Sequence, residues 1–164
     1  MNAGRVLAVC LGPGGLPNHP VESAQVNELG LVGDAHKQEF HGGSLRAVCV
    51  FATEDYARLE RDRVGPFDAG SYGENVLTEG LDFEGLAPGD VLEIGPEVRL
   101  EIHDVRSPCS TLKAQDGRFP DLMLGRSGFL CRVVQGGLLQ AGMAIGVQSA
   151  PPAADMAAEP PRKT

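Results

Sequence analysis

The chain contains 164 residues, with 14 Lys and Arg against 22 Asp and Glu, so its formal net charge at pH 7 is −8. This acidic balance argues against a nucleic-acid-binding protein, because binding through phosphate neutralisation needs a basic surface. The sequence has no apolar run of about 20 residues, the length that a membrane-spanning helix needs. Its N-terminus has too short an apolar stretch for a secretory signal, and we therefore expect a cytoplasmic protein.

The N-terminal part of the chain predicts strands separated by a long loop. Residues 5–11 (RVLAVCL) and 45–51 (LRAVCVF) are apolar apart from Arg5 and Arg46, a pattern that is typical of buried strands. Between them the chain is rich in loop-forming residues up to about residue 43, and it contains strand-like pieces such as residues 21–26.

A short helix is predicted directly after the second of these strands. Thr53 is placed to cap this helix, and Glu54 and Asp55 favour its positively polarised first turn. Residues 64–67 (VGPF) end it, because Gly and Pro interrupt a helix. The next apolar segment, residues 73–79 (GENVLTE), predicts a short strand.

The following segment predicts a pair of strands. After a turn at residues 86–90 (LAPGD), residues 91–95 and 98–103 are joined through Gly95 and Pro96. In the second of these strands apolar and polar side chains alternate, so one face is expected to be buried and the other exposed.

The last part of the chain contains two further predicted strands, residues 129–134 and 143–147, on either side of a glycine turn at 136–137. Residues 109–124, which precede them, allow one or two helical turns.

Seven or eight short strands with one clear helix favour an all-β fold, a closed barrel or a sandwich, over a sheet of alternating strands and helices. We predict one domain over residues 1–148 and a disordered, Pro/Ala-rich tail over residues 149–164.

The four cysteines fall into two groups. Three lie inside apolar runs and are expected to be buried core residues: Cys10, Cys49 and Cys131. Cys109 instead follows the end of a strand, near Arg106 and Lys113, and positive neighbours of this kind lower the pKa of a thiol. Cys109 is therefore the candidate reactive sulfur, and a base for it is available in His103, His36 or His41.

A dedicated zinc or iron site is a weaker hypothesis than a reactive sulfur at Cys109. Asp34, His36, His41 and His103 offer nitrogen and oxygen ligands, and Cys109 offers a thiolate. A structural zinc site needs three or four ligands in a fixed tetrahedron, whereas His36 and His41 lie in a predicted loop rather than on one helix face.

Four motifs occur together in an order and spacing that resembles MOSC domains, which are related to the C-terminal part of molybdenum-cofactor sulfurases. They are G-D-A-H at 33–36 followed by His41 and Arg46, G-E-N at 73–75, L-x-P-G-D-x-L-x-I-G at 86–95 and R-S-P-C at 106–109. The resemblance covers residues 5–147. It implies a closed β-barrel of the pyruvate-kinase-barrel type with one or two short helices.

The resemblance also implies roles for individual residues. The cysteine of the R-x-P-C motif is proposed in this family to carry sulfane sulfur or to bind molybdenum in a pterin cofactor, and this role maps onto Cys109. Catalytic roles beside it are expected for His36 and His103. The expected cofactor-binding residues are Asp34, His41, Arg46, Glu74, Asn75, Arg106 and Lys113, with Lys37 and Arg126 adding positive charge for the phosphate of the pterin.

The implied function is binding of the molybdenum cofactor (molybdopterin), with reduction of N-hydroxylated compounds by electrons from a separate redox partner protein. Pyridoxal phosphate binding is a further property that the family resemblance suggests. Two alternatives stay open: a carrier of cofactor or sulfur without turnover, and a molybdenum-free cysteine-dependent or carbon–sulfur enzyme. The oligomeric state also stays open, with a homodimer as one option.

Overall fold

The computed structural model describes residues 2–14, 16–35, 44–107, 112–113, 116–119 and 121–151. Seven strands form a barrel in the order β11-β7-β8-β9-β5-β6-β1, and pairing of β1 with β11 closes it. These strands are β1 (Ala3–Leu11), β5 (Val48–Ala52), β6 (Val76–Glu79), β7 (Val91–Ile94), β8 (Val98–Val105), β9 (Phe129–Gln135) and β11 (Ala144–Gln148). The predicted strand-dominated barrel is confirmed.

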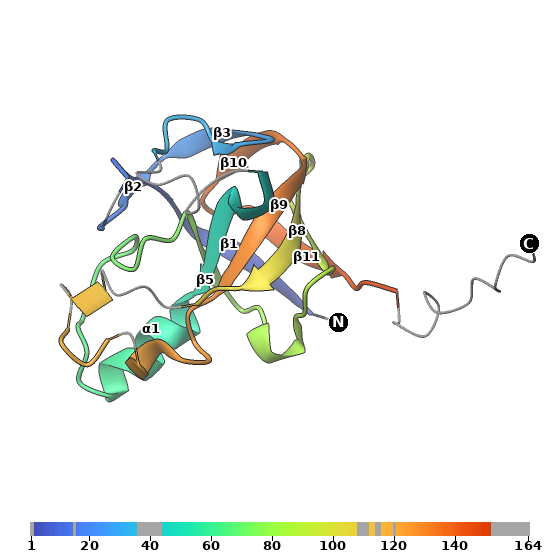
Figure 1. The fold of residues 1–164 in the computed structure, drawn as a ribbon. Helices are drawn as coiled ribbons and strands as arrows, with labels where there is room; N and C mark the ends of the chain where they lie inside the picture. The colour runs from blue at the N-terminus through green and yellow to red at the C-terminus, as the bar shows by residue number, and fades with distance from the viewer. Residues whose placement is uncertain are drawn as a thin grey trace, which may run out of the picture.

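Smaller elements are attached to the barrel. Strand β2 (His19–Val21) pairs with β1, and a second sheet has the order β10-β3-β4, at the top of the view in Figure 1. Its strands are β3 (Ser23–Asn27), β4 (Gly30–Leu31) and β10 (Gly137–Gln140), and the 3-10 turns are η2 (Ser44–Arg46), η3 (Phe83–Gly85) and η5 (Asp121–Met123). Among the described residues there is one α-helix, α1 (Thr53–Arg61).

Burial along the strands shows why the chain forms a barrel with a second core outside it. In β8 the side chains of Val98, Leu100 and Ile102 are buried in the barrel interior, as the alternation predicts. All five residues of β5 are buried, because its two faces meet different apolar clusters. Val50 belongs to the barrel interior, whereas Phe51 belongs to a cluster formed with α1 and the loops beside it.

Helix α1 connects β5 to β6, and these two strands form the parallel pair of the barrel. Its first turn contains Glu54 and Asp55, as expected. The expected capping role of Thr53 is wrong: the N-cap is Ala52, which makes no side-chain hydrogen bond, and Thr53 is already helical. Leu59 is completely buried against the outer wall of the barrel, so apolar packing rather than capping fixes the helix.

Two strand predictions need correction. The predicted strand at residues 73–79 begins only at Val76, because the Gly-Glu-Asn segment forms a turn whose polar groups bond to neighbouring loops and strands. The glycine turn at 136–137 leads into an additional strand, β10, which pairs with β3. Each β10 residue pairs with a residue more than a hundred positions away, a long-range contact that local pattern does not reveal.

The C-terminal end of the described chain remains attached beyond the predicted domain boundary at residue 148. The backbone N–H of Ala150 donates to the Asp90 carboxylate at 2.8 Å. Apart from residues 149–151, the predicted tail lies outside the described residues. No helix within the described part of the chain is long and apolar enough to cross a membrane.

Candidate functional site

Three segments that are distant in sequence meet on the outer side of the barrel wall. They are β5 at Cys49, the turn at residues 72–75 that leads into β6, and the chain that follows β8 at Arg106. Cys49 points away from the barrel interior, because its neighbours Val48 and Val50 fill that interior. The three segments therefore meet outside the barrel interior.

Asn75 joins strands β1 and β5 at this point. Its side-chain oxygen accepts a hydrogen bond from the backbone N–H of Cys49 at 3.0 Å. Its amide nitrogen donates to the carbonyl of Cys10 at 3.3 Å and to the Asp34 carboxylate at 3.0 Å. Asp34 in turn accepts from the backbone N–H of Gly12 at 2.9 Å. Two residues that the sequence singled out separately, Asp34 and Asn75, are thus in direct contact.

The side chain of Glu74 is fully buried, and one of its two carboxylate oxygens accepts hydrogen bonds. Oε1 accepts from the Tyr56 hydroxyl at 2.5 Å and from the backbone N–H of Gly70 at 2.7 Å. Oε2 is buried and has no hydrogen-bond partner among the described residues. A buried acceptor without a partner is costly, so this oxygen is suited to a donor that comes from a ligand.

Arg106 is the complementary group. Its backbone N–H donates to the carbonyl of Gly128 at 2.9 Å, and its Nη2 donates to the carbonyl of Tyr72 at 2.6 Å. The hydroxyl of Ser127 donates to its carbonyl oxygen. Its Nη1 is buried and has no hydrogen-bond partner within the described ranges. The guanidinium is therefore fixed in place with one buried donor available.

The described thiols are buried, as predicted. Burial raises the pKa of Cys10 to about 12, and the Glu74 carboxylate adds to this effect. Burial also raises the pKa of Cys49, although the positive charge of Arg106 acts in the opposite direction. Cys131, inside the barrel, has its pKa raised by burial as well. None of these three thiols is suited to act as a thiolate at neutral pH.

A cluster of aromatic side chains packs around Tyr72, next to Glu74 and Arg106. Tyr72 is almost completely buried, and four other rings pack around it or stack with it, at centroid distances of 4.7–5.9 Å: Phe51, Tyr56, Phe67 and Phe119. Burial raises the pKa of Tyr72 to about 12. Tyr56 was not predicted as a site residue, because its contact with Glu74 spans two elements and has no local signal.

The remaining candidates lie apart from this group or outside the described residues. His103 is exposed on β8, Lys113 is exposed, and Arg46 is exposed in η2. Cys109, His36, His41 and Lys37 lie outside the described residues. Within the described residues, no group of three or more His, Cys, Asp or Glu side chains is arranged to hold a metal ion.

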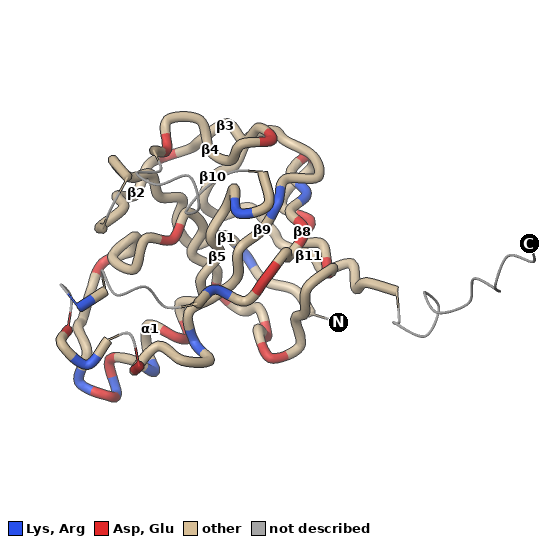
Figure 2. The backbone as a smooth tube through the Cα atoms, in the orientation of Figure 1, with Lys and Arg blue, Asp and Glu red and all other residues tan. Residues whose placement is uncertain are grey.

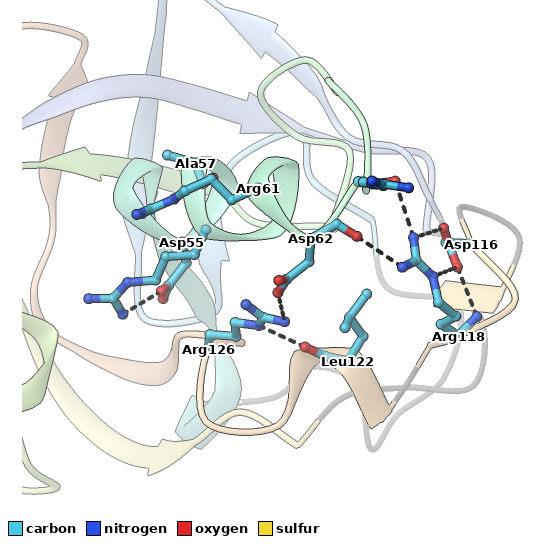
Figure 3. Close-up of polar contacts among 10 residues, drawn as sticks. Asp55, Ala57, Arg61, Asp62, Asp116, Arg118, Leu122 and Arg126 are labelled. Carbon is cyan, nitrogen blue, oxygen red and sulfur yellow. Dashed lines mark hydrogen bonds and ion pairs between the residues drawn. The ribbon is translucent and has the colours of Figure 1, made fainter.

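The segment after Cys109 is fastened to the end of α1, as Figure 3 shows. Arg118 donates to the backbone carbonyls of Asp62 and Arg63 at 2.9 and 3.1 Å. Arg126 pairs with the Asp62 carboxylate at 2.6 Å and donates to the carbonyl of Leu122 at 2.7 Å. Arg126 is thus paired with Asp62, and its expected contribution to a phosphate pocket stays a prediction.

Charge around α1 has no single sign: basic and acidic positions are interspersed along the helix and the loops beside it (Figure 2). The described part of the chain around α1 therefore forms no broad basic surface.

The comparisons with known proteins agree with this architecture. The model of the MOSC domain matches residues 37–146. A protein described as a reductase from Gibberella moniliformis (strain M3125 / FGSC 7600) is 30% identical over 130 residues, which are 74% of this chain and 23% of that protein. Protein YiiM of Escherichia coli (strain K12) is 36% identical over 91 residues, 53% of this chain and 40% of YiiM. The chain thus spans less than half the length of these two relatives.

A solved structure gives the same result at the level of the fold. The crystal structure of YiiM from Escherichia coli superimposes with a TM-score of 0.73 at 26% identity, and the match covers 90% of this chain and 71% of that one.

Proposed function

The chain belongs to the MOSC domain family, and we propose that it binds a molybdenum cofactor (molybdopterin) between Arg106, Glu74 and Cys109. The observation that carries the proposal is the buried Nη1 of Arg106, which has no partner among the described residues although the rest of the guanidinium is held firmly. Such a donor is suited to an anionic group.

The donor set fits the proposed group in two further respects. The unpartnered Oε2 of Glu74 is suited to accept a hydrogen bond from an N–H of a pterin ring. Cys109 follows Arg106 by three residues and offers a soft sulfur ligand, which molybdenum accepts well. When bound, the cofactor supplies redox chemistry that no side chain of this protein can provide.

The residues of the chain then have separate tasks. Arg106 binds the anionic part of the ligand, and Tyr72 fixes the orientation of Arg106 through its carbonyl. Tyr56 and Gly70 hold Glu74 in place by donating to its Oε1, which leaves Oε2 available to a ligand. Asn75 keeps β1 and β5 together beneath it. Exclusion of water by the surrounding apolar cluster strengthens each of these polar contacts.

We further propose that turnover, the reduction of N-hydroxylated compounds, needs electrons from a separate redox partner. The relative described as a reductase supports this proposal, since the region that matches this chain is only 23% of its length.

The test is the molybdenum and pterin content of protein purified from a host that makes the cofactor. We expect both in the wild type, and a ten- to hundredfold loss of affinity in Arg106→Ala, because one charge-assisted contact is worth about 1.5–3 kcal/mol. Arg106→Lys should recover only part of the binding, and Cys109→Ser should remove molybdenum retention. Arg61→Ala, on the exposed face of α1, is the matched control.

Melting curves for each variant separate loss of binding from loss of the fold. A wild type without molybdenum and pterin contradicts the proposal and favours the molybdenum-free cysteine enzyme. Retention of the cofactor without turnover of an N-hydroxylated substrate, in the presence of a reductant, identifies a carrier instead.

A further inference from the structure

A cavity of about 380 Å³ lies beside α1, and its described lining residues include neither Arg106 nor Cys49. Its walls come from α1, from the loop at residues 64–69, and from strands β1 and β6 at Leu7 and Leu77. The volume falls within the range of small-molecule sites in proteins. The walls combine polar and apolar surface in about equal parts, so they suit a ligand that has both an apolar body and a polar group.

Aromatic rings form a large part of the cavity wall. Tyr56, Phe67 and Tyr72 all line it. The rings of Tyr56 and Phe67 are each packed edge-on against Tyr72, with centroids 4.7 and 5.9 Å apart. The hydroxyl of Tyr56 donates to the buried Glu74, so this side chain presents its ring rather than a free hydroxyl. Fixed aromatic faces of this kind attract cations.

The charged residues among the described cavity lining are all acidic. Glu60 and Asp68 line the cavity and are exposed, and the lining residues that the structure describes include no Lys, Arg or His. On the same helix Arg58 pairs with Asp55 at 3.0 Å and is not among the described lining residues. The cavity therefore combines apolar and aromatic side chains with a carboxylate rim, and its described lining residues include no cation.

We propose that this cavity binds a compact organic cation, an ammonium group attached to an apolar or aromatic body. The body of the ligand packs against Phe67, Leu7 and Leu77, and the ammonium group lies between the aromatic faces and the carboxylates of Glu60 and Asp68. The carboxylates of the rim repel an anion of the same shape, and they give a neutral molecule no electrostatic stabilisation. The cavity borders the proposed cofactor site, because Tyr56 lines the cavity and also donates to Glu74, but binding of the organic cation does not require the cofactor.

The test uses benzylammonium as the probe, with benzyl alcohol and benzoate as the neutral and anionic molecules of similar shape. Binding to the purified protein is measured by chemical-shift titration at low ionic strength. We expect benzylammonium to bind at least tenfold more tightly than benzyl alcohol, no detectable binding of benzoate, and weaker binding of the ammonium as salt is added.

Variants locate the site. The double variant Glu60→Gln, Asp68→Asn should reduce benzylammonium affinity about tenfold and leave benzyl alcohol unaffected, and Phe67→Leu should reduce it by removing an aromatic face. Glu28→Gln, an exposed acid in the turn between β3 and β4, is the matched control. Both acids of the double variant are exposed, so its melting curve should match that of the wild type.

Two results would overturn the proposal: equal affinities for benzylammonium and benzyl alcohol, or an unchanged benzylammonium affinity in the folded double variant. Because the titration needs no cofactor, its outcome is independent of the molybdenum measurement.

Discussion

The thiols show how the same residue type acquires different chemistry from its surroundings. Cys10, Cys49 and Cys131 are buried, and burial raises the pKa of each. Cys49 is the instructive case, since the guanidinium of Arg106 lies close enough to lower its pKa and burial still dominates. A nearby cation is therefore not sufficient for a reactive thiol; access to solvent is also needed.

This contrast predicts which thiol reacts first with an alkylating agent. In a brief iodoacetamide pulse near pH 8, cofactor-free protein should be labelled at Cys109, because the three buried thiols are both inaccessible and protonated. Peptide mapping by mass spectrometry identifies the labelled site. Labelling at Cys10 or Cys131 before Cys109 would show that the barrel opens faster than its burial indicates.

At the scale of elements, the backbone of β5 lies very close to the chain at the point where it enters β9. Gly128 lies there with φ +81°, and a Cβ on it would lie 2.1 Å from the carbonyl oxygen of Val50. The same residue accepts the backbone hydrogen bond from Arg106. Gly128 thus allows the chain to pack closely against β5, and its carbonyl accepts the hydrogen bond that helps to position Arg106.

Two glycine variants separate backbone strain from steric overlap. Gly125 has a similar φ of +75°, but a Cβ there would meet nothing within 4 Å. Gly125→Ala should therefore cost only the strain of a left-handed alanine, about 1–2 kcal/mol. Gly128→Ala should cost clearly more, because a strand backbone must move. Chemical denaturation of both variants measures the difference, and equal losses would contradict the role of the Val50 carbonyl.

At the scale of the whole molecule, two apolar clusters share the wall formed by β5 and β6, one inside the barrel and one between the wall and α1. Helix α1 and the chain around η5 lie together at one end of the barrel in Figure 1. Several titratable groups are buried in these clusters or at their edges, and the protein as a whole should respond to alkaline pH.

The sign of that response follows from five groups whose pKa is raised by burial: Cys10, Cys49, Tyr56, Tyr72 and Cys131. Above about pH 9 the unfolded chain releases these protons while the folded protein retains them. Stability from these groups is thus fully present below the pKa values of the unfolded state and is lost as pH rises toward those of the folded state. The melting temperature should fall between about pH 8.5 and 10.5.

Thermal unfolding followed by circular dichroism across this pH interval provides the measurement. Cys10→Ala should make the decline less steep, since it removes one of the retained protons. A melting temperature that stays constant to pH 10.5 would mean that the five groups titrate alike in the folded and unfolded chain.

Much of the barrel was predictable, because the local order of apolar and polar residues identifies its strands. The alternation in β8 places Val98, Leu100 and Ile102 inside, and the apolar runs of β1 and β5 mark buried strands. Strand β10 was not predictable in this way, because its pairing with β3 joins residues more than a hundred positions apart. The N-cap at Ala52 was missed for a different reason: tertiary packing of Leu59 outweighs the preference of Thr53 for a capping position.

For the candidate site, the sequence by itself determined which chemical groups are present: the Gly-Glu-Asn turn, the Arg106 that precedes Cys109, and the acid at Asp34. Only the tertiary structure decided how they are used. Closure of the barrel brings Asp34 onto Asn75, places the Tyr56 hydroxyl on Glu74, and leaves one buried atom of Glu74 and one of Arg106 without partners among the described residues. The physical reason is that burial and hydrogen bonding depend on which distant segments share a volume, and this is set by strand pairing rather than by neighbouring residues.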